Sequence, residues 1–572
     1  MNTIRFLSPI TVPATIHETF WQHLPSLPNG PDLLITFNLR HLKEQTEIRF
    51  ESPILLLNAS EGFVSIGPVH VRGKSVCFSC LYHWIATAGF DQPRQLPLPG
   101  KAEARVAAQM LQVVTAGYVG NGEIPELWSA MHTVDLSANQ HSVHPIYPIR
   151  DCATCGNLPR PNWPGLRIHC NSLTGIVQKM EITSDPTAGA YRAAATWVSP
   201  LPVPGKRPLL SRQDSHGRGM TREQAELSCI GEALERYSLI YRGDEPLRRA
   251  RLSDINGIAP ADILLYSEQQ YKNREQWNAE ADERYFVGEK FHPEQLIDWL
   301  PAMDLFGGRE TFVPAACVLM WYQFQDGEPE FTRADTIGCG SGWTFEDALA
   351  HALFEWIERD AMAIWWYNRV HRPSVSIASF EMPELQKIQH DLRRIDRELI
   401  LLDCTTDIGV PAYVSVAARL DGTEPLFAGA AHLSPKIAAW KAASEVGQVW
   451  FAGMHTKRID SEISRWFANT TATQSYLNPT KEIEAPQEPL PMSSTEQVRL
   501  VVDRLRVAGL HPYAADLSRS DVVLKTVRAI VPGLRHIWNR RAPGRLYDVP
   551  VRLGWLERPL EENELNSICC MI

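Results

Sequence analysis

The sequence contains no long hydrophobic run. In 572 residues there is no uninterrupted apolar stretch of about 18 residues, the length that a membrane-spanning helix needs. The first residues, Met1 to Phe6, do not lead into the apolar segment of a secretory signal peptide. We therefore expect a cytoplasmic protein with reduced cysteines and without a membrane partner.

The sequence also lacks a net positive charge. It has 56 Lys and Arg against 66 Asp and Glu, which gives a formal charge of −10 and a pI near 6.0. Binding to nucleic acid depends on a basic face that attracts phosphates. The composition therefore argues against nucleic acid as a main partner.

What is present is typical of a globular protein of mixed structure. Apolar residues make up 44% and charged residues 21% of the chain, which is long enough for about two to four domains. Strand-like runs such as Leu399–Leu402 and Ala412–Val416 occur among helical patterns, which predicts an α+β fold with mixed α/β character. The proline-rich, polar stretch from Ser475 to Gln497 predicts a mobile surface loop.

Among eleven cysteines, four form two Cys-x-x-Cys pairs, Cys77 with Cys80 and Cys152 with Cys155. The two-residue gap lets both sulfurs of a pair reach one zinc ion at ~2.3 Å, so the two pairs together predict a structural Zn²⁺ site with four thiolates. A redox dithiol is the alternative for either pair alone.

We expect the two Cys-x-x-Cys pairs to lie in an N-terminal module, residues 1–158, which is followed by a catalytic domain, residues 159–572. Within the module we expect strands at 52–57 and 63–66 and a helix at 101–114. A proline-rich linker at 157–164 separates the two parts.

The segment after Thr221 predicts a helix with an acidic face. Thr221 and Gln224 form a capping-box pattern. Ser228, Glu232 and Glu235 then share one face, because a helix turns about 100° per residue. Carboxylates of this kind can hold Mg²⁺, and Arg236 next to them can pair with phosphate. A solvated acidic face is the plain alternative.

A second segment repeats this arrangement. Thr344 and Asp347 again form a capping-box pattern, and the stripe continues through His351, Glu355 and Glu358. Arg359 completes a second Glu-x-x-Glu-Arg sequence, which suggests an internal duplication. Two such helices facing each other would bring four or more carboxylates together, which is tolerable only with cations between them.

These motifs resemble the YcaO superfamily over roughly residues 165 to 565. The resemblance includes the two Glu-x-x-Glu-Arg segments, and it extends to four further motifs: Gly217-Arg218-Gly219, Gly338-Cys339-Gly340-Ser341-Gly342, Val531-Pro532-Gly533-Leu534 and Arg545–Val551. The zinc-bearing region around Gly67-Pro68 and Cys77 is similar to the partner modules of cyclodehydratases. Ile337 stands where the family usually has Asn, and Asp347 where Glu is common.

The resemblance implies an ATP-dependent cyclodehydratase that forms thiazolines or oxazolines from Cys, Ser or Thr of a ribosomally made precursor peptide. It implies that Glu232, Glu235, Glu355, Glu358 and Asp347 hold Mg²⁺, that Ser228, Arg236 and Arg359 position ATP, and that Arg545 contacts phosphate. A separate leader-binding protein is an expected partner. Whether the protein forms a homodimer is left open by the sequence. Two alternatives also stay open: thioamide or amidine formation at the same ATP site, and a non-catalytic, zinc-stapled peptide scaffold.

The last residues differ from the proline-rich tail that azoline-forming members usually carry. Ser567 to Ile572 reads Ser-Ile-Cys-Cys-Met-Ile. We nevertheless expect a late strand over Tyr547 to Trp555 to lead this tail into the active site.

Overall fold

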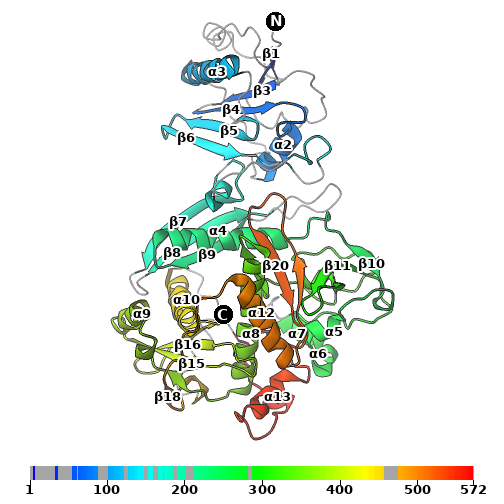
Figure 1. The fold of residues 1–572 in the computed structure, drawn as a ribbon, viewed down its shortest axis with the longest axis vertical. Coiled ribbons are helices and arrows are strands. Elements are labelled where there is room, and N and C mark those ends of the chain that lie inside the picture. Colours follow the sequence, from blue (N-terminus) through cyan, green and yellow to red (C-terminus); the bar gives the residue numbers. More distant parts are fainter. Residues whose placement is uncertain are drawn as a thin grey trace. The chain divides into compact units, whose positions relative to one another are not determined.

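The computed structural model of the chain describes residues 4–6, 32–36, 54–60, 62–87, 101–121, 127–146, 148, 152–158, 165–171, 173–185, 190–199, 212–280, 286–455 and 475–570. The chain divides into two compact units (Figure 1). The first comprises Met1–Glu181, Ala194–Ser215 and Arg519–Val523, and the second the remainder. The functional division into residues 1–158 and 159–572 stays a prediction.

The first unit is built on a six-stranded sheet in sequence order. Its strands are β1 (Ile4–Phe6), β2 (Asp32–Thr36), β3 (Ile54–Ser60), β4 (Phe63–His70), β5 (Ala130–Asp135) and β6 (Gln140–Pro145). The helices are α2 (Phe78–Thr87) and α3 (Lys101–Asn121), and α3 packs on β3 and β4. The predicted strands and helix of this region are therefore confirmed, although α3 continues beyond Val114 to Asn121.

Two mainly antiparallel sheets form the framework of the second unit. One has the order β10 (Arg248–Ala250), β11 (Ile297–Asp304), β19 (Tyr513–Asp516), β20 (Lys525–Ile530) and β13 (Cys339–Gly342), with β12 (Glu310–Pro314) paired to β11. The other has the order β17 (Leu426–Ala431), β16 (Ala412–Arg419), β15 (Arg397–Asp403), β14 (Ser374–Val375) and β18 (Glu482–Ile483). The predicted strands at 399–402 and 412–416 are confirmed as parts of β15 and β16.

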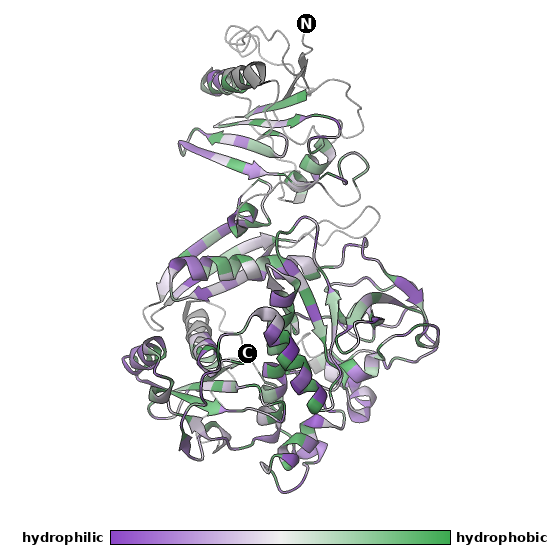
Figure 2. Cartoon of the chain, in the orientation of Figure 1, coloured by the Kyte–Doolittle hydropathy of each residue, from purple (hydrophilic) through white to green (hydrophobic). Residues whose placement is uncertain are grey.

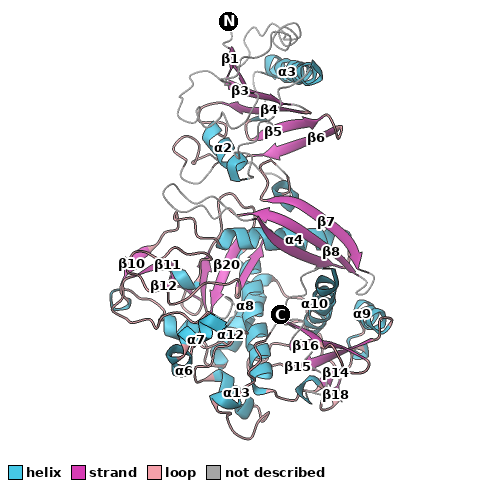
Figure 3. Ribbon diagram, turned by 180° about the vertical axis from the view of Figure 1, so that it is seen from behind, coloured by secondary structure: helices cyan, strands magenta, loops and turns pink. Residues whose placement is uncertain are grey.

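The longest helix of the second unit, α8 (Phe345–Asn368), packs against strands of both sheets, β13 and β20 of one and β16 and β17 of the other (Figure 3). Its C-terminal half is buried, and the ring of Trp366 stacks on Phe427 with centroids 4.7 Å apart. Helices α12 (Ser494–Val507) and α13 (Arg545–Arg552) also pack on α8. Further helices are α5 (Pro260–Leu264), α6 (Glu268–Lys272), α7 (Arg274–Glu280), α9 (Pro383–Arg393) and α10 (Pro435–His455). Together with the mainly antiparallel sheets, these helices confirm the α+β class.

A three-stranded sheet, β7 (Val177–Asp185), β8 (Ala190–Val198) and β9 (Arg212–Gly219), precedes helix α4 (Arg222–Leu239). Hydrophobic and hydrophilic residues are interspersed along α4, as expected for an amphipathic helix (Figure 2). Both predicted capping boxes are confirmed. Thr221 Oγ1 accepts the N–H of Gln224 at 3.2 Å, and Thr344 Oγ1 accepts that of Asp347 at 3.1 Å.

Two predictions about local structure are wrong. The stretch 475–497 contains a 3₁₀ turn at Ser475–Leu477, strand β18 and the beginning of α12, because β18 pairs with β14 and Ser493 caps α12. Residues 547–555, predicted as a late strand, instead form most of α13, whose N-cap is Gly544, and the turn that follows it. Among the described helices, none has the length and apolarity to span a bilayer.

Candidate active site

Two strand–glycine–helix segments, the end of β9 with α4 and β13 with α8, carry the same residues at the same interval. Gly340 follows Gly217 by 123 residues (340 minus 217). The same interval separates Gly219 from Gly342, Thr221 from Thr344, Glu232 from Glu355, Glu235 from Glu358, and Arg236 from Arg359.

The two glycines at the start of each segment lie against the following helix. A Cβ on Gly217 would lie 2.2 Å from the carbonyl oxygen of Ala225, and one on Gly340 would lie 2.2 Å from that of Ala348. Only glycine permits this approach. In both segments the strand therefore runs directly against the first turns of the helix. The glutamates that follow on each helix consequently occupy equivalent positions in the two segments.

On α4, Glu232 is held by two contacts. Its Oε1 lies 2.5 Å from Nη2 of Arg236, and its Oε2 accepts the N–H of His216 at 2.7 Å. Burial, followed by the charges of Glu355 and Glu232, raises the pKa of Glu235 to about 8. The charge of Glu355 reaches Glu235, so these carboxylates of α4 and α8 lie near each other.

On α8, Arg359 lies between the two glutamates of its own motif. Its Nη2 is 3.4 Å from Glu355 Oε1 and its Nη1 is 3.0 Å from Glu358 Oε1. Burial raises the pKa of Glu358 to about 8, against the opposing effect of Arg359, and Glu445 and Glu355 raise it further. The Oε1 atom of Glu358 is buried and accepts no hydrogen bond within the described part of the chain.

Sequence reasoning missed a contribution from α10. Glu445 pairs with Arg218 at 3.0 Å, and the pKa of Lys441 is lowered by burial and by Arg218. Lys441 also lies near Glu358, whose charge acts in the opposite direction and raises the pKa of Lys441. A Lys and a Glu four residues apart on a helix usually indicate a surface ion pair, so nothing in the sequence of α10 pointed to a site.

The remaining candidate residues lie in different surroundings. Ser228 is exposed on α4. The oxygens of Asp347 accept the N–H of Thr344 at 3.1 Å and the hydroxyl of Ser494, and the bond from Ser494 is the main reason that the pKa of Asp347 is lowered.

Arg545 lies away from the glutamates, in an ion-pair group of its own. Its Nη2 is 2.7 Å from Oδ2 of Asp360, which is fully buried, and 2.8 Å from Oδ1 of Asp407. These contacts orient α13 against α8. The role of Arg545 as a phosphate contact stays a prediction.

Residues 565–570 pack along the C-terminal half of α8. Asn566 donates its N–H to the carbonyl of Tyr367 at 2.7 Å, and the indole of Trp366 donates to the carbonyl of Ile568 at 2.8 Å. Cys570 is buried, and the charge of Arg359 reaches its thiol. The chain thus approaches the acidic group at Cys570, whereas Met571 and Ile572 lie outside the described residues, so the predicted end of the tail in the site stays a prediction.

The four cysteines of the two Cys-x-x-Cys pairs come together in the first unit. The Sγ atoms of Cys77 and Cys152 are 3.4 Å apart, those of Cys80 and Cys155 are 3.3 Å apart, and all four lie within 4.8 Å of one another. Tetrahedral zinc with bonds of ~2.3 Å would space the sulfurs by about 3.8 Å. The donor set and its spacing therefore fit one zinc ion.

Comparisons with known proteins agree with this geometry. The family described as YcaO cyclodehydratase, ATP- and Mg²⁺-binding, matches residues 216–535. An uncharacterized protein of Methanothermobacter thermautotrophicus is 27% identical over 331 residues, which is 56% of this chain and 80% of that protein.

Two solved structures are similar over nearly the whole chain. One, a heterocyclase in complex with substrate and cofactor, has a TM-score of 0.84 and 28% identity, covering 99% of this chain and 85% of that one. The other, the heterocyclase TruD, has a TM-score of 0.74 and 25% identity, covering 100% and 84%.

Proposed function

Because the chain belongs to the YcaO cyclodehydratase family and is an ATP-dependent enzyme, we propose that it converts Cys, Ser or Thr residues of a ribosomally made precursor peptide to thiazolines or oxazolines. The contact of α4 with the glycine loop that leads into α8, made by Ser341 with the Gly231 carbonyl and with Glu235, carries this proposal. The overall similarity to a heterocyclase structure with bound substrate and cofactor supports ring formation as the reaction.

In the proposed reaction the sulfur or oxygen of the substrate side chain attacks the preceding backbone carbonyl and forms a five-membered ring. The attacking thiol or hydroxyl loses its proton, and the carbonyl oxygen takes the γ-phosphoryl group of ATP. This oxygen then leaves as part of phosphate while the ring nitrogen loses its proton. ATP becomes ADP, and the peptide loses the elements of water. Phosphorylation is needed because an amide oxygen is a poor leaving group, so the protein must mainly position and neutralise charge.

The glutamates of the two equivalent helices are suited to hold Mg²⁺, which would supply charge neutralisation for the phosphates. Burial and the charges of neighbouring glutamates raise the pKa values of Glu235 and Glu358, so a cation between the helices would stabilise their ionised forms. The buried Oε1 of Glu358 accepts no hydrogen bond although it lies 3.0 Å from Nη1 of Arg359, so Mg²⁺ could bind it if Arg359 turned towards the phosphates.

Cationic side chains around these glutamates would bind the phosphates. Arg236 and Arg359 each pair with a glutamate of their own helix, and Ser228 is accessible on the acidic face of α4. Asp347 is a ligand only if Mg²⁺ displaces Ser494 or Thr344 from its carboxylate.

We also propose that residues 1–158 act as a zinc-stapled module that docks the peptide or a separate leader-binding protein. Metal analysis of the purified chain should give one zinc per chain, and Cys80→Ser should lose it and unfold the first unit. Cys170→Ser is the control, because Cys170 lies in the same unit outside the cysteine cluster. Retention of zinc by the Cys80 variant would contradict the assignment.

The function is tested by mass spectrometry of precursor peptides encoded beside this gene, incubated with the enzyme, ATP and Mg²⁺. We expect a loss of one water mass per ring, dependent on ATP. An increase in mass from exchange of oxygen for sulfur would instead identify thioamide formation. Absence of ATP turnover with every peptide would favour a binding scaffold.

A further inference from the structure

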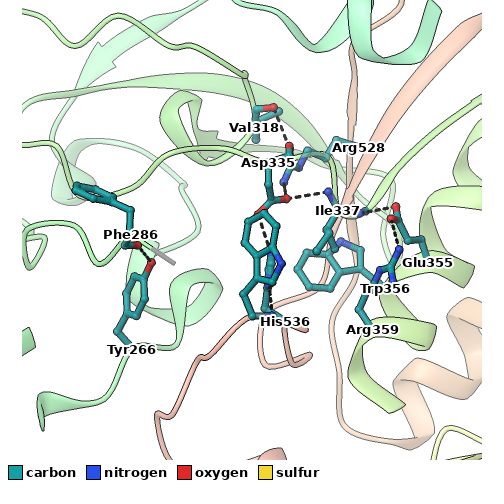
Figure 4. A network of polar contacts seen from close by, with 12 residues as sticks. Tyr266, Phe286, Val318, Asp335, Ile337, Glu355, Trp356, Arg359, Arg528 and His536 are labelled. Carbon is teal, nitrogen blue, oxygen red and sulfur yellow. Dashed lines mark hydrogen bonds and ion pairs between the residues drawn. The ribbon is translucent and has the colours of Figure 1, made fainter. Parts of the chain in front are cut away.

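A buried polar network lies under the glycine loop that leads into α8 (Figure 4). Nη2 of Arg528 is 3.2 Å from Oδ1 of Asp335, and Nε2 of His536 is 2.7 Å from Oδ2 of the same carboxylate. The side chains of these three residues are 5–12% exposed. Burial raises the pKa of Asp335, but its contacts with His536 and Arg528 outweigh burial and lower the pKa to about 2.

A short chain of hydrogen bonds joins this network to Glu355. Asp335 Oδ1 accepts the N–H of Ile337 at 2.8 Å. The next residue, Gly338, donates its N–H to Oε2 of Glu355 at 3.0 Å and accepts the N–H of Ala529 at 2.8 Å. The backbone of two consecutive residues therefore connects Asp335 to a predicted Mg²⁺ ligand.

The loop has little freedom to shift at this point. Gly338 has a φ of +78°, and a Cβ on it would lie 1.9 Å from Nε1 of Trp356. That indole donates to the carbonyl of Ala529 at 2.7 Å and is therefore fixed itself. A displacement of Asp335 would consequently be passed to Gly338 and to Glu355.

The contacts of His536 fix which ring nitrogen carries the proton. Trp538 donates its N–H to Nδ1 of His536 at 3.0 Å, so Nδ1 is an acceptor. Nε2 must then carry the hydrogen and donate it to Asp335. The ring also lies edge-on to Trp356, with centroids 6.1 Å apart.

We propose that Asp335, Arg528 and His536 are positioning residues that hold Glu355 in its ligating orientation through Ile337 and Gly338, and thereby set the Mg²⁺ requirement of nucleotide binding. This inference rests on the proposed function and deepens it. Groups that orient metal ligands typically change metal affinity by about 10- to 100-fold when they are removed.

The test compares His536→Asn with His536→Gln. The amide nitrogen of Gln can take the place of Nε2 and keep the bond to Asp335, whereas the shorter Asn reaches only the place of Nδ1. The measurement is the Mg²⁺ concentration that half-saturates binding of a non-hydrolysable ATP analogue, with thermal unfolding to verify folding. We expect a rise of roughly tenfold for Asn and of less than about twofold for Gln.

His511→Asn is the matched control, because His511 pairs with Asp304 at the same 2.7 Å but forms no part of the network. It should leave the Mg²⁺ requirement unchanged. If His536→Asn does not fold, Asp335→Asn takes its place, since it keeps an acceptor for Ile337 but loses the charge that holds Arg528 and His536.

Equal shifts in the Asn and Gln variants, or no shift in either, would overturn the positioning role. If the unmodified chain failed to bind the analogue at any Mg²⁺ concentration, the proposed function itself would fall and this inference with it. The two failures are therefore distinguishable in one titration.

Discussion

The segments β9–α4 and β13–α8 share a sequence pattern but differ in their surroundings. In the Glu232–Arg236 pair of α4 the side chains are 27% and 33% exposed, and in the equivalent Glu355–Arg359 pair of α8 they are 24% and 16% exposed. Glu232 is held by Arg236 and by the N–H of His216, whereas Glu355 is held by Arg359 and by a glycine loop with a charged network behind it. The two glutamates are therefore about equally exposed, but on α8 the arginine is more buried and the backbone that holds the glutamate is more tightly fixed.

The largest expected effect tests whether the two segments really share their backbone geometry. Gly340→Ala and Gly217→Ala each place a Cβ 2.2 Å from a backbone oxygen, which cannot move aside cheaply. We expect each variant to lose about 3 kcal/mol or more of unfolding free energy in denaturant titrations. Gly231→Ala, at a position with open space on α4, should be nearly neutral. A mild effect at Gly217 alone would show that only the α8 segment is tightly packed.

The next prediction asks whether the two helices contribute equally to the chemistry. Glu235→Gln and Glu358→Gln occupy equivalent positions, and each should reduce peptide-dependent ATP hydrolysis by roughly 10², about 2.7 kcal/mol of barrier, if a metal ligand is lost. The controls are Glu223→Gln and Glu346→Gln, which are equivalent first-turn positions of the same helices. If turnover is unchanged in one of these two variants, the helix that carries the substituted glutamate does not provide a metal ligand at that position.

The C-terminal tail makes the two segments unequal. Among the described residues it packs on α8, and no corresponding segment packs on α4. Deletion of Ser567–Ile572 should reduce peptide modification by roughly tenfold, about 1.4 kcal/mol of barrier, with little change in nucleotide affinity. Mass spectrometry of the peptide and a binding titration measure the two effects. Full-rate modification by the truncated enzyme would leave the tail without a catalytic role.

The last prediction concerns the pH dependence of stability. Burial raises the pKa values of Glu235 and Glu358 to about 8, whereas in the unfolded chain they fall near 4.3. Between these values the folded state binds more protons, so the stability of the metal-free protein should fall as pH rises from about 4.5 to 8, by at most about 1.4 kcal/mol per pH unit for each group. Thermal unfolding across this range should show the slope, and Glu358→Gln should flatten it. A flat profile in the unmodified chain would contradict the raised pKa values.

Short-range signals predicted the helices well. The capping boxes at Thr221 and Thr344 depend on residues three positions apart, and the acidic stripes follow from helix periodicity alone. Lys441 and Arg528 could not be found in this way, because their roles depend on contacts between distant segments. The stretch that contains β18 was predicted wrongly for the same reason, because its proline content says nothing about the partner that β14 provides.

Asp360 follows Arg359 directly but, because a helix turns about 100° per residue, it points to another side of α8, into the buried pair with Arg545. A turn of α8 about its own axis would pull this carboxylate away from Arg545 and from the backbone N–H of Arg535, which it also accepts at 2.9 Å. Leaving such a charge buried and unpaired costs about 3–5 kcal/mol. The helix is thus fixed in rotation, and any opening that admits or releases a nucleotide is expected to come from movement of α4 or α10.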